Sequence, residues 1–231
     1  MKLKKIASLM LAGIMAVSML AGCNGNTIND DPAQSEEPSA PAGYSALVQE
    51  GLSNTATKKV SLNDSTELNN ALKAAMEYAS NSNIAYWYDN VKFPVTVQVV
   101  DDTKQTFARE MVSGVKSLIA DMNAENDEWT TVTGALKNLN PTATNMNKKD
   151  LNATFLFIVD GGKGANGVMN EVASLLNDGV EMLDKHFEDA TTTKRADYEY
   201  VGSVSAYTKT LTGDHDKSLT FVAVNIAREI V

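Results

Sequence analysis

Ala-Thr-Phe-Leu-Phe-Ile-Val, residues 153–159, is a near-continuous apolar run with polar residues before it and a glycine-rich segment after it. A short apolar run bounded in this way is typical of a strand that is buried on both faces. We therefore expect residues 153–159 to form a central strand, flanked by other strands and covered by other elements.

Other segments have strand patterns of a different kind. Phe93 to Val100 alternates valines with polar residues, which predicts a strand with one buried face, and Pro94 places its start at an edge or at the first strand position. Asp197 to Leu211 and Ser218 to Ile230 are rich in Val, Thr, Tyr and Phe, and the segment between them has the composition of a hairpin turn.

Helical periodicity accounts for most of the remaining chain. Asp64-Ser65-Thr66-Glu67 has the residues of a helix cap, ahead of an apolar pattern that continues to about Ser80. Tyr44 to Leu52 fits either a short helix or a strand. Further helices are expected after Asp102 to about Met122, from Asp127 to Leu139, and from the glycine-rich segment to about Phe187.

This order of elements predicts an α+β fold. Two strands that are each followed by helices imply parallel crossover connections, and the C-terminal hairpin adds an antiparallel pair. We expect a two-layer sandwich, with helices on one face of a mixed sheet of about four strands. A three-layer α/β arrangement is the alternative, because residues 153–159 are apolar on both sides.

The first 22 residues are predicted to be removed from the mature protein. Lys2, Lys4 and Lys5 precede an apolar run of 15 residues, Ile6 to Leu20. This order is that of a secretory signal, and the run is shorter than the roughly 20 residues that a membrane-crossing helix requires.

Leu20-Ala21-Gly22-Cys23 follows, and Cys23 is the only cysteine in the chain. Together with the basic start and the apolar run, this tetrapeptide resembles the bacterial lipoprotein signal, and the similarity covers residues 1–23. The resemblance implies a diacylglyceryl lipid on Cys23, with fatty chains such as palmitate, which holds the protein on the outer face of the cell membrane. Two acyl chains make such an anchor stable. An ordinary secreted protein, cleaved after Ala21, is the alternative.

Composition divides the mature chain into two parts. Residues 24–43 hold three of the five prolines and are rich in Asn, Asp, Glu, Ser and Ala. Such a segment cannot bury enough apolar surface to fold. We expect lipidated Cys23 and a disordered acidic linker over residues 23–43, and a single globular domain over residues 44–231. Whether residues 44–63 pack on that domain stays open.

Charge and cysteine content exclude several classes of protein. The whole chain has a formal net charge of −9, and removal of a leader with three lysines and no acid leaves −12. This charge repels nucleic acid and anionic lipid headgroups. A lipidated Cys23 leaves no thiol for a disulfide, a nucleophile or a metal site.

The segment Tyr86-Trp87-Tyr88 is the densest aromatic cluster and is a candidate ligand-binding site. Exposed aromatic rings stack on sugar rings, which suits a protein that faces a cell wall. The alternative interpretation is that two of the three rings pack in the core with polar tips at its edge.

Asp101, Asp102 and Asp160 are candidate metal ligands. They follow strands that we expect to be parallel, and ligands bind at such strand ends in open α/β sheets. If the strands are neighbours, the three carboxylates converge on a divalent cation such as calcium. A capping box from Asp102 to Gln105 is the alternative.

Gly162, Gly164 and Gly167 have the spacing of a dinucleotide-binding loop. Their late position in the chain and the acidity of the protein favour a flexible connection instead, with Asn166 capping the next helix. The two histidines, His186 and His215, fit surface positions.

We expect a non-enzymatic, lipid-anchored, extracytoplasmic module that binds a protein partner or a cell-wall polymer. An envelope hydrolase that uses carboxylates on wall glycan or peptide is the second hypothesis. A small solute receptor serving a transporter is the third.

Overall fold

A computed structural model of the chain describes residues 43–99, 107–121, 132–149, 151–188, 195–211 and 213–231. All of them fall within one compact unit, Ala40–Val231. The elements in chain order are α1 (Tyr44–Gly51), the 3₁₀ turn η1 (Ala56–Lys58), β1 (Val60–Leu62), α2 (Thr66–Met76), α3 (Asn81–Asn90), β2 (Val95–Val99), α4 (Phe107–Asp121), α5 (Val132–Lys137), β3 (Leu151–Asp160), the 3₁₀ turn η2 (Gly161–Lys163), α6 (Gly164–Glu181), β4 (His186–Glu188), β5 (Arg195–Leu211) and β6 (Asp214–Ile230).

The strands form one mixed, six-stranded sheet with the order β1-β5-β6-β3-β2, and β4 pairs with the start of β5. β1 runs parallel to β5, whereas the pairs β4–β5, β5–β6, β6–β3 and β3–β2 are antiparallel. The predicted α+β class, the central strand and the C-terminal antiparallel hairpin are confirmed. The sheet has more strands than the expected four because β1 and β4 have three residues each, too few to show a period of two.

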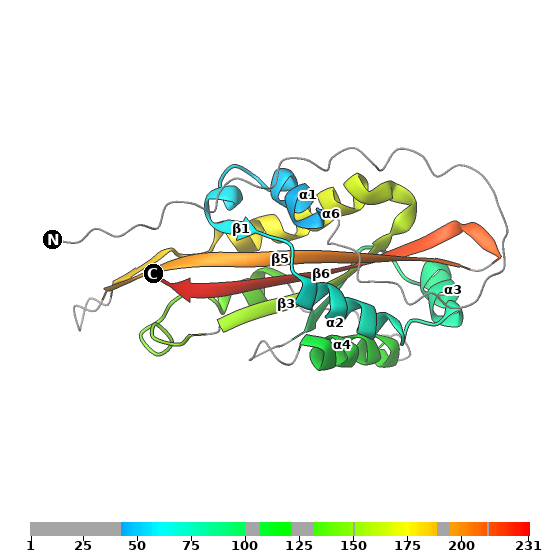
Figure 1. Ribbon diagram of the computed structural model, residues 1–231, viewed down its shortest axis with the longest axis horizontal. Coiled ribbons are helices and arrows are strands. Elements are labelled where there is room, and N and C mark those ends of the chain that lie inside the picture. Colours follow the sequence, from blue (N-terminus) through cyan, green and yellow to red (C-terminus); the bar gives the residue numbers. More distant parts are fainter. Residues whose placement is uncertain (1–42, 100–106, 122–131, 150, 189–194, 212) are drawn as a thin grey trace. The chain divides into compact units, whose positions relative to one another are not determined.

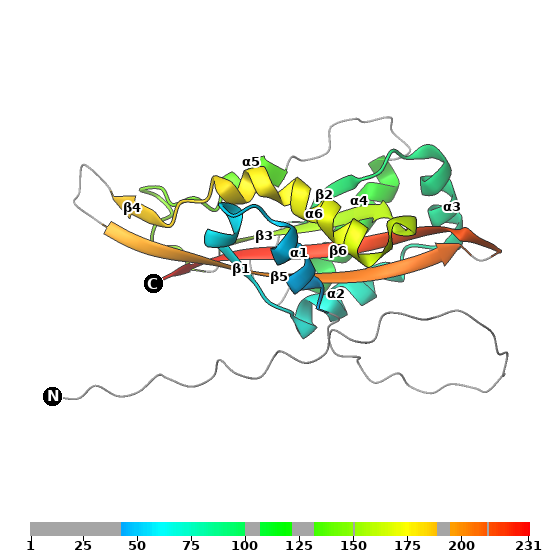
Figure 2. The ribbon, with the colours of Figure 1, turned by 90° about the horizontal axis from the view of Figure 1, so that it is seen from above.

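Helices pack on both faces of this sheet (Figures 1 and 2). Phe155 and Phe157 of β3 join a core cluster with α1, α5 and α6, while Leu156 and Ile158 join a second cluster with α2, α3 and α4. This layering follows the three-layer alternative and not the two-layer sandwich. The physical reason is that successive side chains of a strand point to opposite faces, so an uninterrupted apolar run needs a cover on each.

The expected parallel relation between the strands at 93–100 and 153–159 is wrong. β2 and β3 are antiparallel neighbours, with Val95 opposite Ile158 and Val99 opposite Thr154. A single connecting helix would return the chain to the end where β2 began. Here both α4 and α5 lie between the two strands, and β3 starts beside the end of β2.

Several helix boundaries differ from the expected ones. The segment 44–52, left open by its sequence, is helix α1. The capped helix begins as predicted, with Ser65 as its N-cap, but it ends at Met76. Ser80 then caps α3, through a capping box with Asn83. The last helix was expected to continue to about Phe187. It ends at Glu181, and Phe187 belongs to β4.

Candidate binding groove

An open groove of about 260 Å³ lies where the start of α2 meets the face of the central strands. Its floor is the sheet, and its wall is the turn that leads from β1 into α2. The residues that line it are Asn63, Asp64, Ser65, Glu67, Asn152, Val201, Gly202, Ser203, Asn225, Ala227, Arg228 and Glu229.

The floor of the groove is polar although it belongs to the most buried strands. Thr154 of β3, Asn225 of β6 and Ser203 of β5 are direct cross-strand partners. Nδ2 of Asn225 donates to Oγ1 of Thr154 at 2.8 Å and to Oδ1 of Asn152 at 3.3 Å. Asn225 is only 8% exposed, and no donor among the described residues reaches its Oδ1. The groove therefore has a fixed amide on its floor with an acceptor oxygen left over.

The wall of the groove is held at both ends of α2. At the N-terminus, the Ser65 side chain accepts from the backbone N–H of Leu68 at 3.1 Å, and Oδ1 of Asp64 accepts from the N–H of Ser45 at 3.3 Å. At the other end, Nζ of Lys209 on β5 donates to the carbonyl oxygens of Met76, at 2.9 Å, and of Ala79. Burial lowers the pKa of Lys209. Asp64 therefore ties the start of α2 to α1, and Lys209 ties the end of α2 to β5.

Arg228 lines the groove, but its guanidinium lies on the opposite face of the sheet. There Nη1 donates to the carbonyl oxygen of Leu139 at 2.9 Å, and Nη2 donates to that of Asn145 at 2.6 Å. The guanidinium also lies over the ring of Tyr198, 4.7 Å from its centroid. Burial lowers the pKa of Arg228. The charged guanidinium thus binds carbonyl oxygens of the segment 139–148, on the face away from the groove.

Two tyrosines surround this guanidinium on the closed face. Tyr198 donates its hydroxyl hydrogen to the carbonyl oxygen of Met146 at 2.9 Å, and Tyr200 donates to that of Asp184 at 2.9 Å. Burial raises the pKa of Tyr198, and it raises the pKa of Tyr200 to about 12, although the positive charge of Arg228 opposes both shifts. Both phenols are therefore neutral structural donors.

The predicted aromatic cluster does not form one surface. Trp87 is 2% exposed and packs edge-on against Phe221, with ring centroids 5.9 Å apart. Tyr88 is half-buried against the same core cluster, and Nζ of Lys217 lies 5.5 Å from its ring centroid. Tyr86 alone of the three is largely exposed, at 48%. Consecutive residues of a helix point about 100° apart, so α3 separates the three rings.

The premise of the predicted calcium site is not met. The end of β2 at Val99 lies beside Thr154, six residues from Asp160 and so roughly 20 Å from it along β3. Asp101 and Asp102 themselves lie outside the described residues. Asp160 accepts from the backbone N–H of Gly162 at 2.9 Å, as the cap of η2. Within the described parts of the chain, no group of three or more His, Cys, Asp or Glu side chains could hold a metal ion.

The glycine-rich segment is a strand-to-helix connection. Gly164 has a φ of 68°, a conformation that favours glycine, where η2 turns into α6. Asn166 lies inside α6 and does not cap it, because the helix begins two residues earlier. Lys163, which could approach an anion there, instead pairs with Glu171 at 2.6 Å.

His186 is exposed, and its Nδ1 lies 2.6 Å from Oδ1 of Asp197 on the neighbouring strand. The side chain of His215 and the whole of residues 1–42, including Cys23, lie outside the described residues. Among the helices that the structure describes, none has the length and apolar character needed to cross a membrane.

The groove is not among the sites that the sequence predicted. Its signal was present, because Thr154 and Asn225 are polar residues inside otherwise apolar strand patterns. Each alone is unremarkable, and 71 positions separate them in the chain. Only the register of β3 against β6 shows that they are partners.

Comparison of the chain with protein-family models, with curated proteins and with solved structures found no match. The groove and the sequence are therefore the features from which a function can be inferred.

Proposed function

We propose that the protein is a lipid-anchored binding module on the extracytoplasmic face of a bacterial cell membrane, and that the groove beside α2 holds its ligand, a protein partner or a cell-wall polymer. The observation that supports this most directly is the floor of the groove. Asn225 is more than nine-tenths buried and fixed by Thr154, yet its Oδ1 receives no donor from the described residues.

The size of the groove favours part of a polymer over a whole solute. Sites that enclose small molecules usually measure about 300–1,000 Å³ and are mostly apolar. This groove measures about 260 Å³ and is open, and asparagine, serine and carboxylate side chains are among the residues that line it. It fits one residue of a peptide or glycan that continues past the groove on both sides.

The proposed location comes from the first 43 residues. Leu20-Ala21-Gly22-Cys23 supports a lipid on Cys23, and the proline-rich acidic segment after it supports a linker that lets the domain reorient above the membrane. Radiolabelled palmitate should enter the wild-type chain and not a Cys23→Ala variant, which should also lose its membrane association. Equal membrane association of both would contradict the anchor.

Cosedimentation with purified cell walls tests the binding function, using the full chain processed in a bacterial host and extracted in detergent. Ser203→Tyr places a large side chain over the floor and should abolish cosedimentation. Thr210→Tyr changes an exposed residue of the same strand outside the groove and should leave it intact. The proposed site is wrong if both variants sediment like wild type while their thermal unfolding is unchanged.

A further inference from the structure

Three cross-strand rows of side chains cross β5 and β6 at the groove. In β5 and β6 alternate residues face α2, so each row consists of two register partners on that face. The acidic row is Glu199 opposite Glu229, the apolar row is Val201 opposite Ala227, and the amide row is Ser203 opposite Asn225. Adjacent rows lie about 7 Å apart along the strands.

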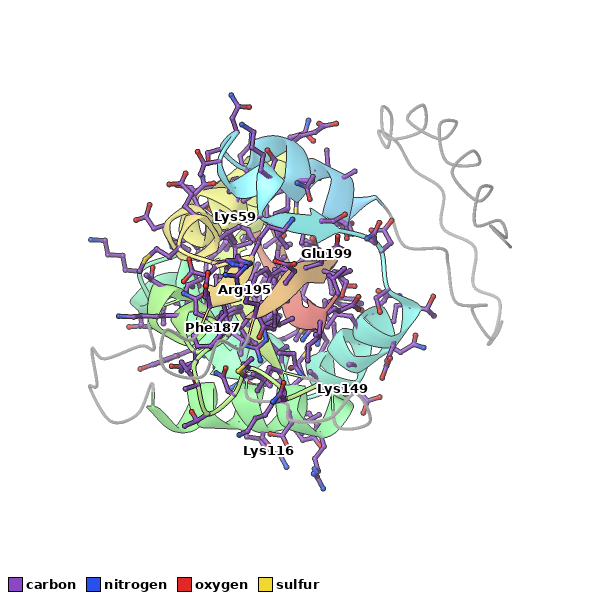
Figure 3. The ribbon with its side chains drawn as sticks, turned by 90° about the vertical axis from the view of Figure 1, so that its left-hand side faces the viewer. Lys59, Lys116, Lys149, Phe187, Arg195 and Glu199 are labelled. Atoms are coloured by element: carbon purple, nitrogen blue, oxygen red, sulfur yellow. The ribbon has the colours of Figure 1, made fainter. Side chains whose placement is uncertain are left out.

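The acidic row is an unfavourable pair by itself. Like charges directly opposite each other destabilise a sheet. Neither Glu199 nor Glu229 forms an ion pair with a described residue, and both are exposed. Figure 3 shows Glu199 at the end of the sheet that this view faces. A cation that binds here removes a repulsion that the free protein retains.

The groove next to this row adds further negative charge and no available positive charge. Asp64 and Glu67 line its wall, near Glu229 of the floor. Arg228 is the one basic residue among the lining residues, and its guanidinium is bonded to carbonyl oxygens on the other face. Within the described residues, these carboxylates do not form a group that could hold a metal ion.

The amide row needs a donor as well. Oδ1 of Asn225 is an acceptor without a partner in the described structure, on a side chain that is 8% exposed. The carboxylates and this oxygen are all hydrogen-bond acceptors, so a ligand rich in donors suits them. An ammonium group has three donors and no acceptor, and a peptide N–H adds one more.

We propose that the groove binds a lysine-type side chain of a peptide, with its ammonium at the acidic row, its methylene stem over the apolar row, and a backbone N–H directed at Asn225. Lysine buries its stem along apolar surface while its charged head stays in a polar environment. Val201 and Ala227 supply that surface between the carboxylates and the amide. An amino sugar carries its nitrogen directly on the ring and has no stem to cross this row. This ligand assignment rests on the proposed binding function.

The probes are N-acetyl-Gly-Lys-Gly-amide and the same peptide with an acetylated lysine, titrated by calorimetry into the full processed chain. The lysine peptide should bind at least about tenfold more tightly, a difference of about 1.4 kcal/mol, and its advantage should shrink as salt rises. Free glucosamine should bind no better than the acetylated peptide. Equal binding of both peptides, or preferred binding of glucosamine, would overturn the assignment.

Protein variants locate the effect. A double change of Glu199→Gln and Glu229→Gln should remove the preference for the lysine peptide, and the free protein should be as stable as wild type or more stable, because the like charges are gone. Glu77→Gln at the other end of α2 is the matched control and should keep the preference. Loss of the preference in Glu77→Gln, or its retention in the double variant, contradicts the site.

The two proposals fail in different ways. If the chain cosediments with cell walls and Ser203→Tyr abolishes this, while neither peptide binds, the ligand class is wrong and the binding function stands. If neither the walls nor the peptides bind, both proposals are wrong.

Discussion

The two faces of the sheet differ in what the polar side chains of their central strands contact. On the face covered by α1, α5 and α6, the guanidinium of Arg228 and the hydroxyls of Tyr198 and Tyr200 all donate to backbone carbonyl oxygens. On the face covered by α2, α3 and α4, the apolar cluster reaches Ala223 on β6, and Asn225 next on that face lies on the floor of the groove.

This difference separates a structural role from a binding role. Both faces carry polar residues of β6, so polarity alone does not mark a site. Arg228 is enclosed, and both of its Nη groups donate to carbonyl oxygens although its Nε is buried without a partner. Asn225 instead keeps an acceptor beside the groove. Stability measurements on the two faces can therefore test whether the closed face is structural and the open face is available for a ligand.

The largest effect is expected for Arg228→Met. Methionine keeps an unbranched stem but leaves the carbonyl oxygens of Leu139 and Asn145 without their donor, so we expect a loss of about 3–5 kcal/mol in the free energy of unfolding. Asn225→Ala on the open face should cost only about 1 kcal/mol, because water in the groove can replace the amide. Urea unfolding of both variants measures the difference, and equal losses would contradict the distinction between the faces.

Local patterns in the sequence predicted individual strands and helix caps better than they predicted how the strands pair. The apolar run at 153–159 and the cap at Ser65 predicted elements whose causes lie within a few residues. The antiparallel pairing of β2 with β3 depends on how two intervening helices route the chain, which no local pattern encodes. The groove depends on the register that places Asn225 opposite Thr154, so sequence patterns predicted the strands but not their shared polar floor.

A pH dependence should appear at the closed face. Burial raises the pKa of Tyr200 from 10.0 to about 12, so the folded protein keeps this proton after the unfolded chain has lost it. The stabilisation is complete below pH 10 and is lost as the pH rises from 10 to about 12. Tyr200→Phe should be about 1 kcal/mol less stable than wild type below pH 10, because the hydrogen bond to Asp184 is lost.

The difference between the two proteins should shrink as the pH rises through this range. Wild type and variant share Tyr198 and Lys209, whose pKa values are also shifted, so the difference between their profiles reports mainly Tyr200 and its interaction with Tyr198. Urea unfolding at several pH values, with tyrosinate absorbance as a second signal, measures it. A constant difference up to pH 12 would mean that Tyr200 is not buried as described.

The smallest effects compare two serines that are each 2% exposed. Ser45, at the start of α1, accepts from the backbone N–H of Val204 at 3.0 Å, where β1 no longer covers the edge of β5. Ser205 faces the α2 side, and its Oγ is buried without a partner. Ser45→Ala leaves a buried N–H unpaired and should cost about 1–2 kcal/mol, whereas Ser205→Ala removes an unpaired hydroxyl and should be neutral or slightly stabilising.

Both changes delete one oxygen from an equally buried site, so the difference in unfolding free energy reports hydrogen bonding and not packing. A loss in Ser205→Ala as large as in Ser45→Ala would show that the Ser205 hydroxyl has a hydrogen-bond partner. The difference in hydrogen bonding between the two faces would then be supported by Arg228 and Asn225 alone.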